Sequence, residues 1–213
     1  MTFRDRADAG RQLGARLREE RLVDPVVLGL PRGGVVVAAE VAAALRAPLD
    51  IVVARKLGVP RQPELAFGAV APGAIALRDD VIAAAGLVRA DVDAAAARES
   101  AQLPDLARRY RGAVPALPLA GRTALIVDDG LATGATATAA ARSARRADPE
   151  RVIVAAPVCA APTASELRLE VDAVICLGEY ADFRSVGAYY DDFAPGSDEE
   201  VRELLAAWRT GRL

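Results

Sequence analysis

Short apolar runs alternate with helical patterns along much of the chain. Residues 25–30 (PVVLGL) are predicted to form a buried strand, and the Ala-rich residues 35–45 the helix that follows it. Residues 49–54 (LDIVVA) are predicted as the next strand. Because strands that alternate with helices are typical of parallel sheets, this pattern favours an α/β fold.

The second half of the chain continues this pattern. Strands are predicted at residues 123–127, 151–157 and 173–177. A helix at residues 135–147 connects the first two of them. A capping-box spacing (TASE) that starts at Thr163 predicts a short helix before the third.

Three helices and one irregular segment are predicted outside this core. Residues 5–22 have an amphipathic pattern, and residues 90–111 predict a long helix interrupted near Pro104. A second capping box, at Ser197, predicts the start of a C-terminal helix. The Pro- and Gly-rich residues 58–80 predict turns and a small hairpin rather than another layer of the sheet.

The composition excludes several kinds of chemistry. The chain has 27 basic and 29 acidic residues, a net charge of −2, which argues against a protein that coats nucleic acid or anionic lipid. It has no histidine, which excludes Ser-His-Asp and Cys-His catalysis and the common His-containing zinc sites. Cys159 and Cys176 lie in apolar runs and are expected to be reduced core thiols.

We expect a cytoplasmic protein that neither enters a membrane nor binds nucleic acid. The first six residues (MTFRDR) are too polar for a signal peptide. The longest apolar stretches, such as residues 152–162, are shorter than the ~20 residues that span a bilayer.

Residues 124–136 (ALIVDDGLATGAT) combine two acids with an anion-binding turn. A buried strand delivers Asp128 and Asp129 to its carboxyl end, where open α/β sheets bind ligands. A turn of small residues then leads into a helix, and a helix N-terminus suits a phosphate. Thr133 and Thr136 add hydroxyl donors. Because the acids can accept hydroxyl groups while the turn holds an anion, the pattern favours a phosphorylated sugar.

Two further acid pairs serve as internal controls. Asp79-Asp80 and Asp191-Asp192 do not lie between an apolar strand and a small-residue helix start, so an acid pair alone indicates little. The alternative for residues 124–136 is an ordinary strand–turn–helix with a solvent-exposed acid pair.

The sequence VDDGLATGAT resembles the phosphoribosyl-pyrophosphate (PRPP) motif of type I phosphoribosyltransferases. The resemblance implies that Asp128 and Asp129 hold the ribose 2- and 3-hydroxyls. It also implies a 5-phosphate loop made of Ala132, Thr133, Gly134, Ala135 and Thr136. Ala135 departs mildly from the family, which often has Gly at that position.

Residues 29–34 (GLPRGG) resemble the pyrophosphate loop of the same family. The resemblance assigns the leaving pyrophosphate to Arg32, Gly33 and Gly34, with a cis peptide near Pro31–Arg32 or Arg32–Gly33. The segment is neither a Walker A loop nor a GxGxxG loop. The alternative is a tight strand-to-helix turn with Arg32 in solvent.

A basic pair, Arg55-Lys56, follows the LDIVVA strand and resembles the step in orotate and adenine phosphoribosyltransferases where cations contact pyrophosphate. A functional role is favoured for Lys56, whereas a solvent-exposed strand end is the alternative. Arg61 lies where those enzymes have a mobile loop, and its role is left open.

Aromatic residues gather between residues 183 and 193 in a chain that is only 4% aromatic. Phe183, Tyr189 and Tyr190 could form a hood on which a planar acceptor stacks. They could equally cover the sheet edge as core or form a dimer contact, and the packing interpretation is favoured.

The resemblance covers nearly the whole chain and implies a single domain, residues 1–213, with a Rossmann-like open parallel sheet flanked by helices. The core is expected at about residues 23–57 and 120–180, with an inserted segment at about 58–112. A small hood would be formed by residues 181–213 with the N-terminal helix.

The implied function is transfer of the 5-phosphoribosyl group from PRPP to a nitrogenous acceptor, such as a nucleobase, with release of pyrophosphate. Asp128, Asp129, Lys56 and Arg32 are the catalytic candidates. Mg²⁺ would arrive with PRPP, with water-mediated contact to the two acids as an option. The partners would be PRPP and a small-molecule acceptor, and a homodimer is one option. The alternatives are a PRPP- or nucleotide-sensing regulator without turnover and a hydrolase or phosphorylase of a ribose 5-phosphate derivative.

Overall fold

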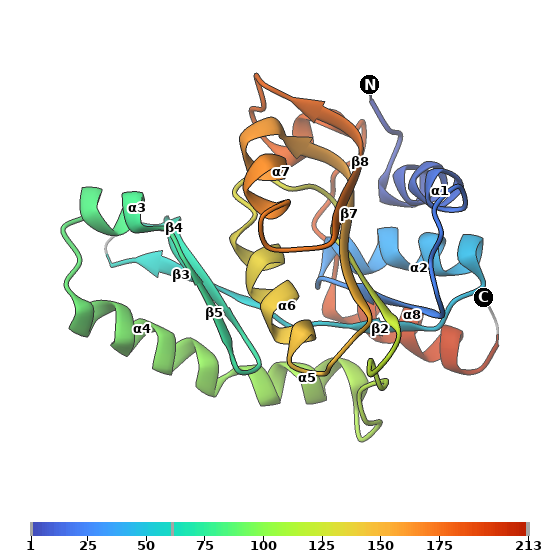
Figure 1. Cartoon of the computed structure of the whole chain (residues 1–213), viewed down its shortest axis with the longest axis horizontal. Coiled ribbons are helices and arrows are strands. Elements are labelled where there is room, and N and C mark those ends of the chain that lie inside the picture. The colour runs from blue at the N-terminus through green and yellow to red at the C-terminus, as the bar shows by residue number, and fades with distance from the viewer. Residues whose placement is uncertain (1, 61, 212–213) are drawn as a thin grey trace.

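A five-stranded, all-parallel sheet lies at the centre of the molecule, in the order β2-β1-β6-β7-β8 (Figure 1). The computed structural model describes residues 2–60 and 62–211. The strands are β1 (Pro25–Gly29), β2 (Leu49–Ile51), β6 (Thr123–Val127), β7 (Arg151–Ala160) and β8 (Ala173–Tyr180). This arrangement confirms the predicted α/β fold with an open parallel sheet.

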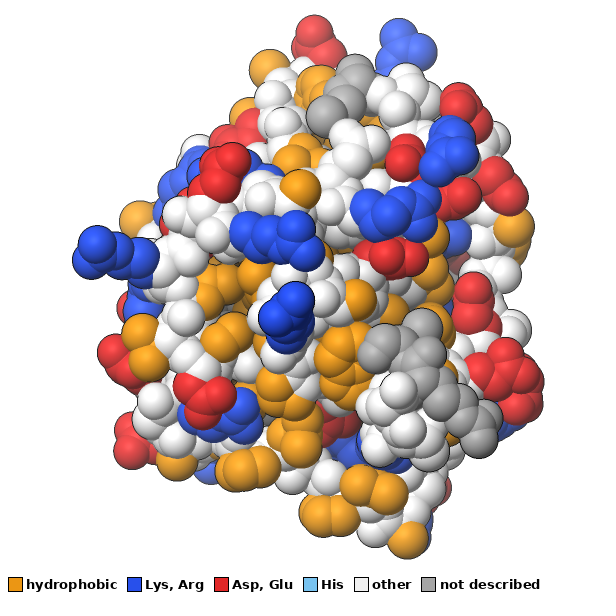
Figure 2. All heavy atoms as spheres, turned by 90° about the vertical axis from the view of Figure 1, so that its right-hand side faces the viewer, with side chains coloured by type: hydrophobic (Ala, Val, Ile, Leu, Met, Phe, Trp, Pro, Cys, Tyr) orange, Lys and Arg blue, Asp and Glu red, His pale blue; other side chains and the backbone are white. Residues whose placement is uncertain are grey.

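Helices cover both faces of this sheet, which explains why its central strands are almost continuously apolar. Every residue of β6 is buried. The helices on one face are α1 (Arg6–Leu17), α2 (Gly33–Leu45) and α8 (Asp198–Arg209), and those on the other are α6 (Ala135–Arg145) and α7 (Ala161–Leu167) (Figure 1). On the face that carries α1 and α2, acidic and basic side chains are interspersed, as the small net charge suggests (Figure 2).

The register of the sheet brings two loops together. Gly29, the last residue of β1, pairs with Val127, the last residue of β6. The pairing continues one step further, because the Leu30 amide donates to the Val127 carbonyl at 2.9 Å. The segments that follow the two strands, residues 30–34 and 128–136, therefore begin side by side at the carboxyl edge of the sheet.

A separate antiparallel sheet occupies most of residues 58–80, for which the sequence predicted turns and a small hairpin. It consists of β3 (Arg55–Val59), β4 (Gln62–Ala71) and β5 (Ala74–Leu77), followed by α3 (Asp79–Ala84). The predicted hairpin is present, because β4 and β5 pair antiparallel across a turn at Pro72 and Gly73, and the segment adds no strand to the parallel sheet. The third strand, β3, and the continuation of β4 through Gly68 were not predicted. A Cβ on Gly68 would overlap the Ala76 carbonyl, so this glycine permits close strand approach rather than a turn.

The remaining helices agree with the sequence in part. The interruption near Pro104 is confirmed, since α4 (Arg89–Ala101) ends just before α5 (Leu103–Arg111). The predicted cap at Ser197 is also confirmed, because its Oγ accepts from the Glu200 amide at 3.0 Å. The predicted cap at Thr163 is wrong: α7 begins earlier, and Thr163 Oγ1 donates to the Ala132 carbonyl. α1 ends five residues earlier than predicted, at Leu17.

Among the described residues, no helix combines the length and apolar character needed to cross a membrane.

A buried ion pair fixes edge strand β2. Asp50, only 2% exposed, accepts from Arg111 Nε at 2.7 Å and from the Leu117 amide at 2.9 Å. Asp50→Ala would leave the Arg111 charge without its partner, so we expect the free energy of unfolding to fall by about 3–5 kcal/mol. Asp105→Ala is the control, because Asp105 and Arg108 form an exposed pair whose loss should cost less than about 1 kcal/mol. Urea denaturation measures both, and equal losses would contradict this role for Asp50.

Candidate functional site

A cavity of about 240 Å³ opens at the carboxyl edge of the parallel sheet. Its walls come from the loop after β1, from the loop after β6, from the start of β3 and from Val186. Most of the residues that the sequence singled out line it together: Arg32, Gly33, Lys56, Asp128, Asp129, Ala132, Thr133, Gly134 and Thr136. Segments that are almost a hundred residues apart in the sequence therefore form one site.

The two acids at the end of β6 have different environments. Asp128 Oδ1 accepts from the Asp129 amide at 2.9 Å. Burial, followed by the charge of Asp129, raises the pKa of Asp128 well above its usual range. Asp129 instead pairs with a cation: Arg6 Nε donates to Asp129 Oδ2 at 2.7 Å. Both carboxyl groups line the cavity, where they can accept or share hydrogen bonds with sugar hydroxyls.

The loop after β1 packs directly against these acids. The Pro31–Arg32 peptide is cis, at one of the two predicted positions. A Cβ on Gly33 would overlap Asp129 Oδ2, and a Cβ on Gly34 would lie 2.8 Å from the Asp128 Cα. Glycine is therefore required here by close contact with the acid pair. Gly34 packs against the backbone of Asp128 and does not line the cavity.

The loop after β6 has the form of an anion cradle. The Leu131 amide donates to the Val158 carbonyl at 2.9 Å, and Thr163 Oγ1 holds the Ala132 carbonyl at 2.6 Å. Gly134, with φ of +69°, precedes α6, which has no acidic residue in its first turn and no side-chain cap. The positive end of the helix thus faces the cavity beside Thr133 and Thr136.

Ala135 lies outside the cavity lining. Its side chain is buried against Ala69, Ala71 and Ala76 of the second sheet. The departure from the glycine often found at this position therefore adds a packing contact, and Ala135 can reach a ligand only through its backbone.

Gly134→Ala is expected to destabilise the cradle. The substitution meets the positive-φ penalty of about 1–2 kcal/mol, and its Cβ would lie 2.7 Å from Thr163 Cγ2. Gly86→Ala is a matched control, since Gly86 has φ of +64° and nothing within 4 Å of the added Cβ. We expect Gly134→Ala to cost about 1–3 kcal/mol more than Gly86→Ala in thermal or urea unfolding. Equal costs would show that Thr163 does not constrain the loop.

The cations of the site divide into three cases. Lys56, on β3, lines the cavity. Its positive charge partly offsets the rise in the pKa of Asp128 that burial and Asp129 cause. Arg32 also lines the cavity, and its side chain is largely exposed. Its Nη1 lies 3.9 Å from Asp198 Oδ1. Arg55 does not line the cavity, and its Nε pairs with Glu99 of α4 at 2.7 Å. Arg61 lies outside the described residues.

The aromatic residues of the predicted hood pack mainly on one another. Phe183 stacks on Tyr189 with ring centroids 5.3 Å apart. Tyr190 is buried, and its hydroxyl donates to the Asp129 carbonyl at 2.6 Å, so its ring offers no open face to an acceptor. The residue of this segment that lines the cavity is Val186. The arrangement agrees with the packing interpretation.

Sequence reasoning missed two features of the site: the contact of Arg6 with Asp129, and the fact that Lys56 is the single lysine of the chain. Arg6 lies in the first turn of α1, where acids are normally favoured, and that was the only local signal. Lys56 is the only lysine in a chain that otherwise uses arginine for every basic side chain. An arginine forms planar two-point contacts, whereas a lysine is a compact point charge suited to phosphate. The composition alone could therefore have singled out this residue.

The fold and the cavity together define an α/β protein in which an acid pair and a helix N-terminus share one cavity at the carboxyl edge of the sheet. The chain belongs to the phosphoribosyl transferase domain family, whose model matches residues 4–191.

Two Mycobacterium tuberculosis proteins, from strains CDC 1551 / Oshkosh and ATCC 25618 / H37Rv, bear the name "Putative phosphoribosyl transferase". Each is 48% identical to this chain over 204 residues, which is 95% of this chain and 46% of the relative. The chain thus spans about half the length of these relatives.

Solved structures show the same fold. The crystal structure of TT1426 from Thermus thermophilus has a TM-score of 0.81 and 42% identity, covering 98% of this chain and 99% of that one. AQ2163 from Aquifex aeolicus has a TM-score of 0.53 at 12% identity, covering 95% of this chain and 85% of that one, and shows a likeness of fold only.

Proposed function

We propose that this chain transfers the 5-phosphoribosyl group of PRPP to a nitrogen atom of a small acceptor and releases pyrophosphate. One observation carries the proposal: the paired acids, the anion cradle and Lys56 line a single cavity at the carboxyl edge of the sheet. Membership of the phosphoribosyl transferase domain family supports it. A nucleobase is the class of acceptor that we favour.

We assign each part of the cavity to one part of PRPP. The 5-phosphate would bind the amides and hydroxyls of residues 132–136, at the positive end of α6. The ribose hydroxyls would bind Asp128 and Asp129. The pyrophosphate would lie against the loop of Arg32 and Gly33, with the Lys56 ammonium beside it.

The reaction breaks the bond between C1 and the pyrophosphate oxygen, and the electron pair of that bond leaves with pyrophosphate. A bond forms between C1 and the acceptor nitrogen, which releases its proton to solvent. Negative charge grows on the departing pyrophosphate, so fixed cations and amides that face it stabilise the transition state. Lys56 and Arg32 have this role. The acids and the phosphate cradle hold the ribose so that C1 faces the acceptor, which lowers the entropic part of the barrier.

The donor set of the cavity fits a Mg²⁺ ion that PRPP carries in. Among residues 2–60 and 62–211, no group of three or more His, Cys, Asp or Glu side chains could hold a metal by itself. Mg²⁺ commonly keeps several waters and binds through one or two carboxylates plus substrate phosphates, a need that Asp128 and Asp129 can meet. When bound, the ion would neutralise charge on the pyrophosphate.

The test is a pyrophosphate-release assay with protein, Mg²⁺, PRPP and a panel of purine and pyrimidine bases and simple amines. We expect acceptor-dependent release with at least one member of the panel. PRPP binding without release for any acceptor would point to a sensor. Release of ribose 5-phosphate without an acceptor would point to a hydrolase. Absence of PRPP binding would contradict the proposal itself.

A further inference from the structure

We propose that Arg6 is a positioning residue for the ribose, acting through Asp129. The inference rests on the proposed function, since it concerns the same cavity. Arg6 belongs to α1, far from the PRPP-like motif in sequence, yet its Nε donates to Asp129 Oδ2 at 2.7 Å. Only 12% of the Arg6 side chain and 16% of the Asp129 side chain are exposed, so solvent weakens this pair less than a surface pair.

The contact leaves one side of the carboxylate available. Arg6 occupies Asp129 Oδ2, and among the described residues no hydrogen-bond donor reaches Oδ1. Asp129 lines the cavity, so the free oxygen is the acceptor that a ribose hydroxyl would use. Without Arg6 the carboxylate could rotate about its side-chain bonds, and the hydroxyl would have to select one orientation at an entropic cost.

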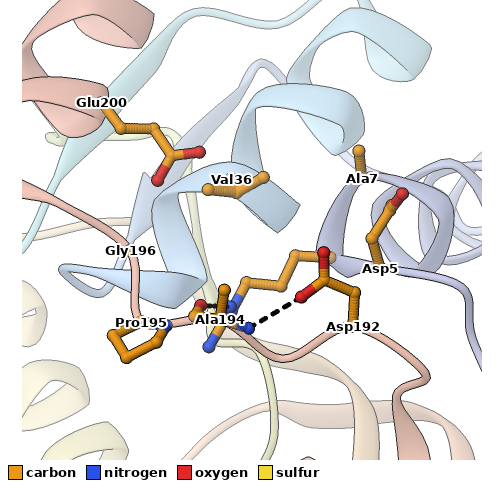
Figure 3. Close-up of a pocket in the computed structure, with 9 residues that line it drawn as sticks. Asp5, Ala7, Val36, Asp192, Ala194, Pro195, Gly196 and Glu200 are labelled. Atoms are coloured by element: carbon orange, nitrogen blue, oxygen red, sulfur yellow. Dashed lines mark hydrogen bonds between the residues drawn. The ribbon is translucent and has the colours of Figure 1, made fainter.

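Arg6 is itself held by two further contacts from the C-terminal segment. Its Nη1 donates to the Ala194 carbonyl at 2.7 Å, and its guanidinium carbon lies 3.9 Å from the centroid of the Phe193 ring. Asp192 accepts from the Ala194 amide at 3.0 Å, which fixes the segment that carries the carbonyl (Figure 3). A side chain restrained at three points can hold its partner in a single orientation.

The same segment also fixes the backbone of Asp129. The Tyr190 hydroxyl donates to the Asp129 carbonyl at 2.6 Å. A Cβ on Gly33 would lie 2.6 Å from Arg6 Nε, so the pair also packs against the proposed pyrophosphate loop. The N-terminal helix, the C-terminal segment and the pyrophosphate loop therefore meet at this one carboxylate.

This arrangement predicts an effect that is largest for ligands with ribose hydroxyls. Arg6 neutralises Asp129 and does not line the cavity with the phosphate cradle. Its loss should therefore weaken ribose 5-phosphate and PRPP more than pyrophosphate. For Arg6→Gln we expect the Kd of both ribose ligands to rise about tenfold, the usual size for one charged hydrogen bond.

Isothermal titration calorimetry with Mg²⁺-PRPP, ribose 5-phosphate and Mg²⁺-pyrophosphate measures the Kd of each ligand and tests the proposal. The matched control is Arg11→Gln on the same helix, where Arg11 is 47% exposed and pairs with Glu40. Arg11→Gln should bind all three ligands as the wild type does. Arg6→Lys keeps a charged donor, so it should lose less ribose affinity than Arg6→Gln. If Arg6→Gln does not fold, Arg6→Lys is compared with the wild type on the same three ligands.

A double-mutant cycle separates positioning from a general structural effect. If Arg6 acts through Asp129, Arg6→Gln should change ribose 5-phosphate affinity far less in an Asp129→Asn background than in the wild type. An equal effect in both backgrounds, an equal weakening of pyrophosphate, or unchanged ribose affinity would each overturn the proposal. Failure of the proposed function is a different result: the wild-type protein would then bind neither PRPP nor ribose 5-phosphate.

Discussion

Asp128→Asn is expected to lower kcat/KM for PRPP by at least about 100-fold, the usual effect of losing a group that acts on the reacting centre. The free energy of unfolding should stay the same or rise. Burial is the main cause of the raised pKa of Asp128, so a neutral side chain of the same shape is favoured at this position. The asparagine keeps Oδ1 for the Asp129 amide and loses one acceptor oxygen.

The loss of activity is therefore expected without loss of structure. Steady-state kinetics and thermal unfolding on the same preparation measure the two effects. The double variant Asp79→Asn, Asp80→Asn is the matched control, because this other acid pair lies at the start of α3, away from the cavity. Its kcat/KM should remain within about twofold of the wild type, since surface substitutions usually have small effects. Full activity in Asp128→Asn would contradict the site assignment.

Lys56→Ala is expected to lower kcat/KM by about 100-fold, through loss of a charge that faces the departing pyrophosphate. Lys56→Arg should recover part of the loss, because a guanidinium keeps the charge but differs in shape from an ammonium. Arg55→Ala is the matched control: it removes a neighbouring cation of the same strand that pairs with Glu99 outside the cavity. Equal losses for the two alanine variants would contradict the distinction that the structure draws between them.

The single lysine allows a second measurement of the same point. An amine-specific reagent can modify only Lys56 and the terminal amine, so peptide mass spectrometry can follow Lys56 alone. Mg²⁺-pyrophosphate should slow the modification of Lys56 and leave the rate at the terminal amine unchanged. Equal rates at Lys56 with and without pyrophosphate would remove it from the pyrophosphate site.

The part of the site that the residues alone predicted, without the family resemblance, is local. In residues 123–136 a buried strand, the acid pair, the loop and the helix follow one another without interruption, so one apolar run and one composition change reveal all four. The structure places the strand at Thr123–Val127, as predicted, and starts α6 at Ala135, the predicted residue.

The contacts that the sequence did not reveal join distant segments. Arg6 and Asp129 are separated by 123 positions, and nothing near Arg6 in the sequence indicates its partner. Arg55 and Lys56 are adjacent and both basic, but alternate residues of a strand point to opposite sides, so one lines the cavity and the other pairs with Glu99. The hairpin of the second sheet was predicted, but its third strand and the full length of β4 were not, because glycine marks both turns and close strand approach.

The most direct test of this account is a crystal structure of the protein soaked with Mg²⁺-PRPP. We expect the 5-phosphate within hydrogen-bond distance of the amides of residues 133–136, the ribose hydroxyls against Asp128 and Asp129, and the pyrophosphate beside Lys56. PRPP bound at another place, or a cavity that stays empty at saturating PRPP, would contradict the assignment of this cavity as the phosphoribosyl site.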